Sequence, residues 1–159
     1  MTVKKVILIG SGVRETYIAK RLFIDTNGEI AITVILTKRN PEISSYAKNI
    51  FLVNDFSLET FLCNSHIESF INKNFRDIDF AVIGPEQPLK EGFADFFESI
   101  GIRTIGPKMN LAKLETSKLY CREFLRKNRL SHLSPMWCDI SGMTKFNVYK
   151  NFKFLNKKY

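Results

Sequence analysis

The chain has 159 residues, 45% of them hydrophobic and 25% charged, which is enough for one sizeable core. It holds no apolar run of membrane-spanning length and no signal-peptide cleavage site near its N-terminus, so we expect a soluble, cytoplasmic protein. The net charge of +8 is uneven: residues 1–102 carry 11 Lys and Arg against 13 Asp and Glu, whereas residues 103–159 carry 13 against 3.

Strand and helix patterns alternate along the first half of the chain. KKVILIG (4–10) is a short apolar run ending in Gly, which predicts a buried strand. Residues 14–23 place their apolar side chains on one face and predict a helix. After an Asn-Gly turn, the β-branched run at 29–37 predicts a second strand, and residues 48–54 predict a third, short one.

The second half continues this alternation. Residues 57–75 predict one helix, with Ser57 as its N-cap. The elements expected next are a strand ending in Gly-Pro, a helix closed by Gly, a short strand and one or two helical segments, at residues 78–86, 89–101, 102–107 and 109–128. The sequence therefore predicts an α/β fold, with a mostly parallel sheet and helices on both faces.

The C-terminal stretch, residues 134–159, is rich in Lys and aromatic residues. Phe146, Tyr149 and Phe152 recur at helical spacing and predict a short helical extension. One interpretation is a non-catalytic interaction module whose basic aromatic tail binds nucleic acid or a partner chain. The simpler one is a set of helix faces that pack on further lobes, so nucleic acid is the less favoured partner.

Three strand ends are expected at one edge of the sheet, where α/β proteins bind ligands: Gly10–Glu15, Thr37–Pro41 and Gly84–Glu86. The turn formed by Gly10, Ser11 and Gly12 offers backbone N–H groups and a helix N-terminus to an anion. This motif alone favours a phosphate or ribose-phosphate site, and a tight turn without a ligand stays open as the alternative.

A nicotinamide dinucleotide fits this turn poorly. Glu15 stands where the dinucleotide fingerprint has its third Gly. Lys38 and Arg39 follow the second strand, where a carboxylate would bind the ribose, and two cations beside a helix N-terminus suit a phosphate or are simply solvated loop charges.

Two further charged residues are candidates. Glu86 lies between two prolines, which restrict the backbone and hold the carboxylate at the expected crevice. There it could accept hydrogen bonds from a pair of sugar hydroxyls, and the alternative is a solvent-exposed loop acid. Lys118 lies in a predicted helix, and without further information we interpret it as a solvated lysine. The three cysteines and two histidines are too few and too scattered for a disulfide framework or a metal site.

The chain contains, in order, the stretches GSGVRE (10–15), RNP (39–41), VIGPEQPL (82–89), GIRTIGP (101–107) and LETSKLYCREFL (114–125). With these stretches the sequence resembles phosphoribosylamine–glycine ligases, which belong to the ATP-grasp superfamily. The likeness covers roughly residues 1–137. It implies a Rossmann-like pre-ATP-grasp domain over residues 1–107 and a helical, truncated start of the ATP-grasp region over 108–159. The implied reaction joins glycine to 5-phosphoribosylamine with ATP, in purine biosynthesis.

The resemblance also implies roles for single residues. Gly10, Ser11, Gly12, Arg14 and Glu15 would lie at the ribose-phosphate, with Asn40 nearby, and Glu86 would face the ribose hydroxyls. Lys118 would contact the nucleotide phosphates. ATP and Mg²⁺ are the implied cofactors, although most of their ligands are not found in these 159 residues.

Departures from the family pattern concern the turn and the length. Val13 replaces a Gly of the family, and we expect it to distort the turn if that position needs a positive φ. Thr16 replaces a His. Because family enzymes are more than twice as long, we expect a fragment, a split enzyme completed by a second chain with the ATP-grasp lobes, or a decayed copy. The 159 residues alone are predicted to be inactive.

Overall fold

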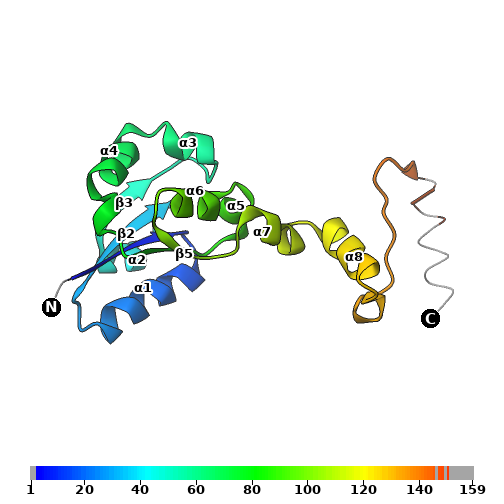
Figure 1. The fold of residues 1–159 in the computed structure, drawn as a ribbon, viewed down its shortest axis with the longest axis horizontal. Coiled ribbons are helices and arrows are strands. Elements are labelled where there is room, and N and C mark those ends of the chain that lie inside the picture. The colour runs from blue at the N-terminus through cyan, green and yellow to red at the C-terminus, as the bar shows by residue number, and fades with distance from the viewer. Residues whose placement is uncertain (1–2, 146, 149, 151–159) are drawn as a thin grey trace. The chain divides into compact units, whose positions relative to one another are not determined.

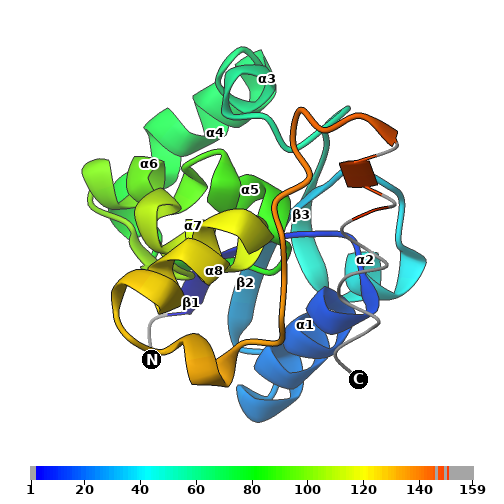
Figure 2. The ribbon, with the colours of Figure 1, turned by 90° about the vertical axis from the view of Figure 1, so that its right-hand side faces the viewer.

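A computed structural model describes residues 3–145, 147, 148 and 150. They form two compact units, which divide between Thr116 and Ser117. Figures 1 and 2 show the ribbon from two directions. In the described part of the chain, no helix has the length and apolar character needed to cross a bilayer.

The first unit is built on a five-stranded sheet in the order β3-β2-β1-β4-β5, in which all neighbours are parallel. The strands are β1 (Lys4–Ile9), β2 (Ile30–Leu36), β3 (Ala47–Leu52), β4 (Phe80–Ile83) and β5 (Arg103–Ile105). All seven residues of β2 are buried, as expected for a parallel strand covered on both faces. The predicted α/β class with a mostly parallel sheet is confirmed.

Helices cover both faces of this sheet (Figure 1). On one face, α1 (Val13–Asp25) and α2 (Pro41–Tyr46) enclose a core around Val6, Leu8 and Val34. On the other, a larger and Phe-rich core includes Phe61, Phe93 and Phe97. The helices of this second face are α3 (Leu58–Leu62), α4 (Ser65–Asn74), α5 (Glu86–Lys90), α6 (Phe93–Ser99) and α7 (Met109–Thr116), with the 3₁₀ turn η1 (Phe75–Asp77) after α4.

The helix predicted over 57–75 is in fact two helices. Ser57 caps α3 as predicted, accepting the N–H of Thr60 at 3.1 Å. Asn64 then begins α4, because its side-chain oxygen accepts the N–H groups of His66 and Ile67. The new helix turns its own apolar face to the core, so Leu62 is left 45% exposed.

The helix predicted over 89–101 is also divided. It starts earlier, at Glu86 directly after Pro85, and forms α5. Gly92 has a φ of 84°, in the left-handed region that Gly adopts at little cost, and α6 begins after it. Further along, Ser117 accepts the N–H of Tyr120 and so separates α7 from α8 (Lys118–Lys127).

Helix α7 packs against α5, and the backbone N–H of Met109 donates to the Asp95 carboxylate at 2.8 Å. The contacts therefore group α7 with the sheet, whereas the predicted division at residue 107 assigns it to the second domain; that domain division stays a prediction. The second unit contains α8 and the 3₁₀ turn η2 (Ser131–Leu133). Phe146, Tyr149 and Phe152, which define the predicted tail helix, lie outside the described residues.

Candidate functional site

The strand ends singled out in the sequence lie side by side in the first unit. The N–H of Gly10, after β1, donates to the carbonyl of Ile35 in β2 at 3.1 Å. The N–H of Gly84, after β4, donates to the carbonyl of Ile9 at 3.0 Å. The turn after β1 is thus flanked by the ends of β2 and β4, at the edge where parallel sheets bind ligands.

Glu15 is the buried centre of this turn. Its residue exposure is only 3%, and its Oε2 accepts the N–H of Gly12 at 2.7 Å. Its Oε1 accepts the Arg14 Nε at 3.2 Å. The carboxylate therefore satisfies a backbone donor that precedes α1 and lies at the positive end of the helix dipole.

Two glycines make room for that carboxyl group. A Cβ at Gly84 would overlap Oε1 of Glu15 and lie 2.5 Å from its Cδ. A Cβ at Gly10 would lie 2.6 Å from Cγ of Glu15, and the φ of Gly10 is +132°. Gly10 and Gly84 thus approach Glu15 from the ends of two different strands, and neither position accommodates a side chain beside it.

Ser11 joins the turn to the end of β2. Its hydroxyl oxygen accepts the N–H of Thr37 at 2.9 Å and that of Lys38 at 3.3 Å. These bonds fix the loop that carries Lys38 and Arg39, whose side chains are exposed. Ser11 is brought to the predicted site, and its hydroxyl is used to hold two strand ends together.

Asn40 has a similar bridging role. Its Oδ1 caps α2 by accepting the N–H groups of Glu42 and Ile43. Its Nδ2 donates to the Ser11 carbonyl and to the Thr16 hydroxyl, both at 3.1 Å. Asn40 thereby connects the starts of α1 and α2.

Thr16 completes this network, a role that the sequence analysis missed. It is 5% exposed, and its hydroxyl donates to the Gly12 carbonyl at 3.0 Å. The available signal was a hydroxyl residue four positions after the capping Gly12, since Ser and Thr in helices bond to the carbonyl at i−4.

Arg14 and Glu86 are two charged groups beside the turn that remain accessible. Their side chains are 58% and 52% exposed, and Arg14 Nη2 lies 3.9 Å from Glu86 Oε1. Arg14 therefore bridges the buried Glu15 and the exposed Glu86, which begins α5. A surface pair of this kind contributes little stability, and both groups are available to a ligand.

Val13 does not strain the turn. The described residues with positive φ, glycines apart, are Asn27 and Arg129, so Val13 keeps a negative φ. It is the first residue of α1 and is 74% exposed. The condition under which we expect a distortion, a positive φ at Val13, is not met, because Gly12 takes an extended conformation and the helix starts directly after it.

Lys118 belongs to the second unit, where it is the first residue of α8 and is exposed. Its contact with nucleotide phosphates stays a prediction. Within the described ranges, no group of three or more His, Cys, Asp or Glu is placed to hold a metal ion, and the three cysteines are free thiols.

Comparison with known proteins gives consistent results. Residues 4–115 match the family described as the phosphoribosylglycinamide synthetase N domain. The phosphoribosylamine–glycine ligase of Methanocaldococcus jannaschii is 36% identical over 123 residues, which are 77% of this chain and 26% of that protein. The ligase of Pyrococcus horikoshii is 34% identical over 153 residues, or 96% of this chain and 30% of that protein. The chain thus spans less than a third of the length of these curated relatives.

Among solved structures, the biotin carboxylase domain of a single-chain bacterial carboxylase superposes with a TM-score of 0.58 at 11% identity. The match covers 97% of this chain and 34% of the carboxylase chain. At this identity the likeness concerns the fold alone, which is of the Rossmann-like, pre-ATP-grasp type.

Proposed function

Because this chain belongs to the phosphoribosylglycinamide synthetase N-domain family, we propose that its first unit binds the ribose-phosphate part of 5-phosphoribosylamine. The observation that carries the proposal is the exposed Arg14–Glu86 pair beside the turn at Gly10–Gly12, held in place by the buried Glu15. Glu15, the other charged residue of the turn, is buried and bonded to the Gly12 N–H, whereas Arg14 and Glu86 are exposed.

The phosphate takes the positive side of this site, at the start of α1. The N–H groups of Val13 and Arg14 begin the 13-residue helix α1 and have no hydrogen-bond partner within the described part of the chain. Together with the Arg14 guanidinium they form an anion site, since helix N-terminal N–H groups and arginine both suit phosphate. Lys38 and Arg39, on the adjoining loop, add positive charge.

Glu86 binds the sugar. An ionised carboxylate is an acceptor only, and it suits the donating hydroxyls of a ribose. Pro85 directly before it and the buried Pro88 after it restrict the backbone that carries it. Ser11, Glu15 and Asn40, which the resemblance assigns to the ligand, act in this proposal by fixing the turn.

The complete ligase reaction needs more than these residues. By family resemblance, ATP and Mg²⁺ bind to ATP-grasp lobes, glycine is converted to an acyl phosphate, and the amine of phosphoribosylamine attacks it. We propose that those lobes are supplied outside residues 1–159, by a longer form or a second chain, and that Lys118 contributes to the nucleotide site. The alternative, a nucleic-acid or partner-binding module, rests on the basic, aromatic tail, of which residues 146, 149 and 151–159 lie outside the described residues.

Ribose 5-phosphate tests the proposal, since it carries the phosphate and hydroxyls without the amine. We expect saturable binding to the 159-residue chain by calorimetry, with amide shifts at Gly12, Val13 and Glu86 in NMR spectra. Arg14→Gln removes a charge-assisted contact and should weaken binding about tenfold or more, and Glu86→Gln somewhat less. Arg21→Gln is the matched control, because Arg21 is exposed on the same helix and pairs with Asp25.

Two results would overturn the assignment. One is the absence of saturable binding at millimolar ribose 5-phosphate. The other is binding that Arg14→Gln and Glu86→Gln leave at the level of the Arg21→Gln control.

A further inference from the structure

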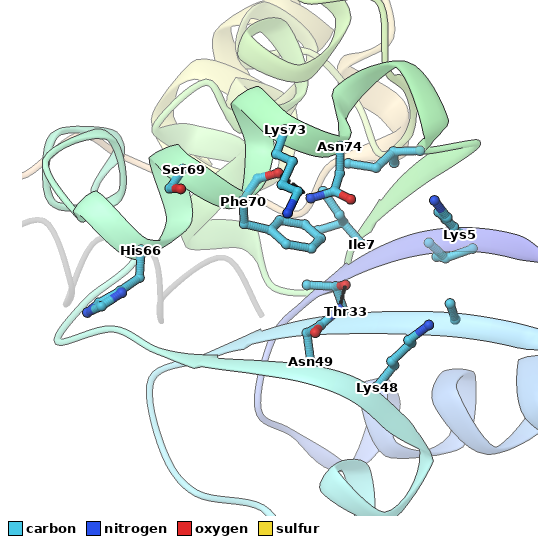
Figure 3. A pocket seen from close by; sticks show the side chains of 13 residues that line it. Lys5, Ile7, Thr33, Lys48, Asn49, His66, Ser69, Phe70, Lys73 and Asn74 are labelled. Atoms are coloured by element: carbon cyan, nitrogen blue, oxygen red, sulfur yellow. Dashed lines mark hydrogen bonds between the residues drawn. The ribbon is translucent and has the colours of Figure 1, made fainter.

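A hollow of about 400 Å³ lies on the sheet face that α4 covers, away from the strand ends described above. Figure 3 shows Phe70, Lys73 and Asn74 projecting from α4 on one side, and Thr33 and Asn49 projecting from β2 and β3 on the other. A volume of this size is typical of small-molecule sites.

The floor of the hollow is polar where the fold alone would favour an apolar residue. Thr33 is the one hydroxyl residue in the strand IAITVIL, and it is only 4% exposed. Its Oγ1 accepts the Asn49 Nδ2 at 3.1 Å, which leaves the Thr33 hydroxyl hydrogen to donate. A buried hydroxyl adds nothing to sheet packing that Val would not supply, so this pair points to a polar occupant.

Lys48 is placed at the hollow by an irregularity of the sheet. Ala47 pairs with Ile32, but the next pair joins Asn49 to Thr33, so Lys48 is an extra residue on β3 with no partner on β2. Such bulges redirect side chains and occur next to functional sites. The same shift brings Asn49 opposite Thr33, so one irregularity determines the positions of both Lys48 and the Asn49 amide.

The charge of the lining is positive. Lys5, Lys48 and Lys73 contribute cations, and none of the lining residues is a carboxylate. Lys5 donates to Asp77 at 2.9 Å. Because this ion pair is exposed, it is weak and competes little with a ligand for the Lys5 ammonium. Lys48 and Lys73 form no ion pair within the described residues. Ile7 and the ring of Phe70 supply an apolar surface beside these charges.

We propose that this hollow binds a small phosphorylated molecule, with its phosphate between Lys48, Lys73 and Lys5 and its organic part against Phe70. The Thr33 hydroxyl and Asn49 amide provide the polar contacts of the floor. This site is separate from the Arg14–Glu86 pair, because Lys5 and Lys48 are the second residues of their strands, whereas that pair follows the strand ends.

Residue-resolved NMR titration of the 159-residue chain, with inorganic phosphate and with AMP, tests this site. We expect saturable shifts of the Thr33 and Asn49 amides, with AMP binding more tightly because it also contacts Phe70. The double variant Lys48→Gln/Lys73→Gln should weaken AMP binding about tenfold or more, because it loses two charge-assisted contacts. Lys113→Gln, an exposed lysine of α7, is the control and should leave it unchanged.

Arg14→Gln separates the two sites, since it should weaken binding at the Arg14–Glu86 pair and preserve the shifts at Thr33 and Asn49. The inference is overturned if the hollow shows no saturable shift with either probe, or if the double lysine variant binds AMP as the control does. Binding of an oligonucleotide through these lysines without saturable AMP binding would also overturn it.

Discussion

The contact between Gly84 and Glu15 gives the sharpest test of how the turn is built. Gly84→Ala adds one methyl group at a position with an ordinary φ, so the backbone accepts it without strain. The added carbon would lie 2.5 Å from Cδ and 2.6 Å from Cγ of Glu15. Because Glu15 is buried and bonded to the Gly12 N–H, it cannot move away freely.

Two costs combine in this variant. Overpacking in a filled site costs about 1–3 kcal/mol. Displacing the carboxylate also breaks its bond to the Gly12 N–H, and hydrogen bonds to charged groups contribute about 1.5–3 kcal/mol. We therefore expect Gly84→Ala to lower the free energy of unfolding by about 2.5–6 kcal/mol, the sum of these two costs. Urea unfolding of the 159-residue chain, followed by far-UV circular dichroism, measures it.

A double-mutant cycle assigns that loss to Glu15. Glu15→Ala alone should destabilise the protein, but it empties the space that the methyl group added by Gly84→Ala needs. The two changes together should therefore cost at least about 1 kcal/mol less than the sum of the single ones. Gly101→Ala is the control: it strains a backbone with a φ of +85°, has no heavy atom within 4 Å of its added carbon, and should be additive with Glu15→Ala. Additive costs for Gly84→Ala and Glu15→Ala would refute the packing described here.

Three further variants test separate contacts by the same unfolding measurement. Thr16→Val keeps the shape but loses the bonds to the Gly12 carbonyl and Asn40 Nδ2, and we expect a loss of about 1–3 kcal/mol; an unchanged midpoint would contradict the network. Asn64→Ala removes the cap that starts α4 and should cost about 1 kcal/mol, whereas a continuous helix over 57–75 would gain from Ala. The Lys4 ammonium, at 2.6 Å, and then the Lys5 N–H lower the pKa of Asp79, so its stabilisation is present above the unfolded pKa of about 3.9 and is lost as the pH falls through the folded pKa. Asp79→Asn should therefore be less stable than the parent at pH 7 and approach it as the pH falls through the folded pKa of Asp79, and a gap independent of pH would count against this pairing.

Local patterns in the sequence were sufficient to predict the strands of the sheet. The β-branched run predicted at 29–37 became β2 (Ile30–Leu36), and Ser57 caps α3, because strand burial and N-caps depend on residues next to one another. The helix boundaries at Asn64 and Gly92 were not predicted. Asn and Gly disfavour the continuation of a helix at these points. Whether the helix ends there depends on core contacts that a single sequence does not show.

The candidate site was predicted as a set of positions but not as a set of roles. The turn, Asn40 and Glu86 could be found because strand ends of a parallel sheet converge. The division between accessible Arg14 and buried Glu15 could not, since the burial of Glu15 depends on Gly84, 69 positions further along the chain. Likewise, the bulge that places Lys48 depends on how β3 pairs with β2, which no local pattern encodes.

The missing third Gly of the dinucleotide fingerprint has a physical explanation in this arrangement. In that fingerprint the third Gly lets helix and strand approach closely. Here Glu15 stands at the position, and the close approach is achieved from the other side, by Gly10 and Gly84. The exchange places a carboxylate at the start of α1, where it already uses the Gly12 N–H. An anion at this turn then needs positive charge from elsewhere, and Arg14, which contacts both Glu15 and Glu86, is the residue placed to supply it.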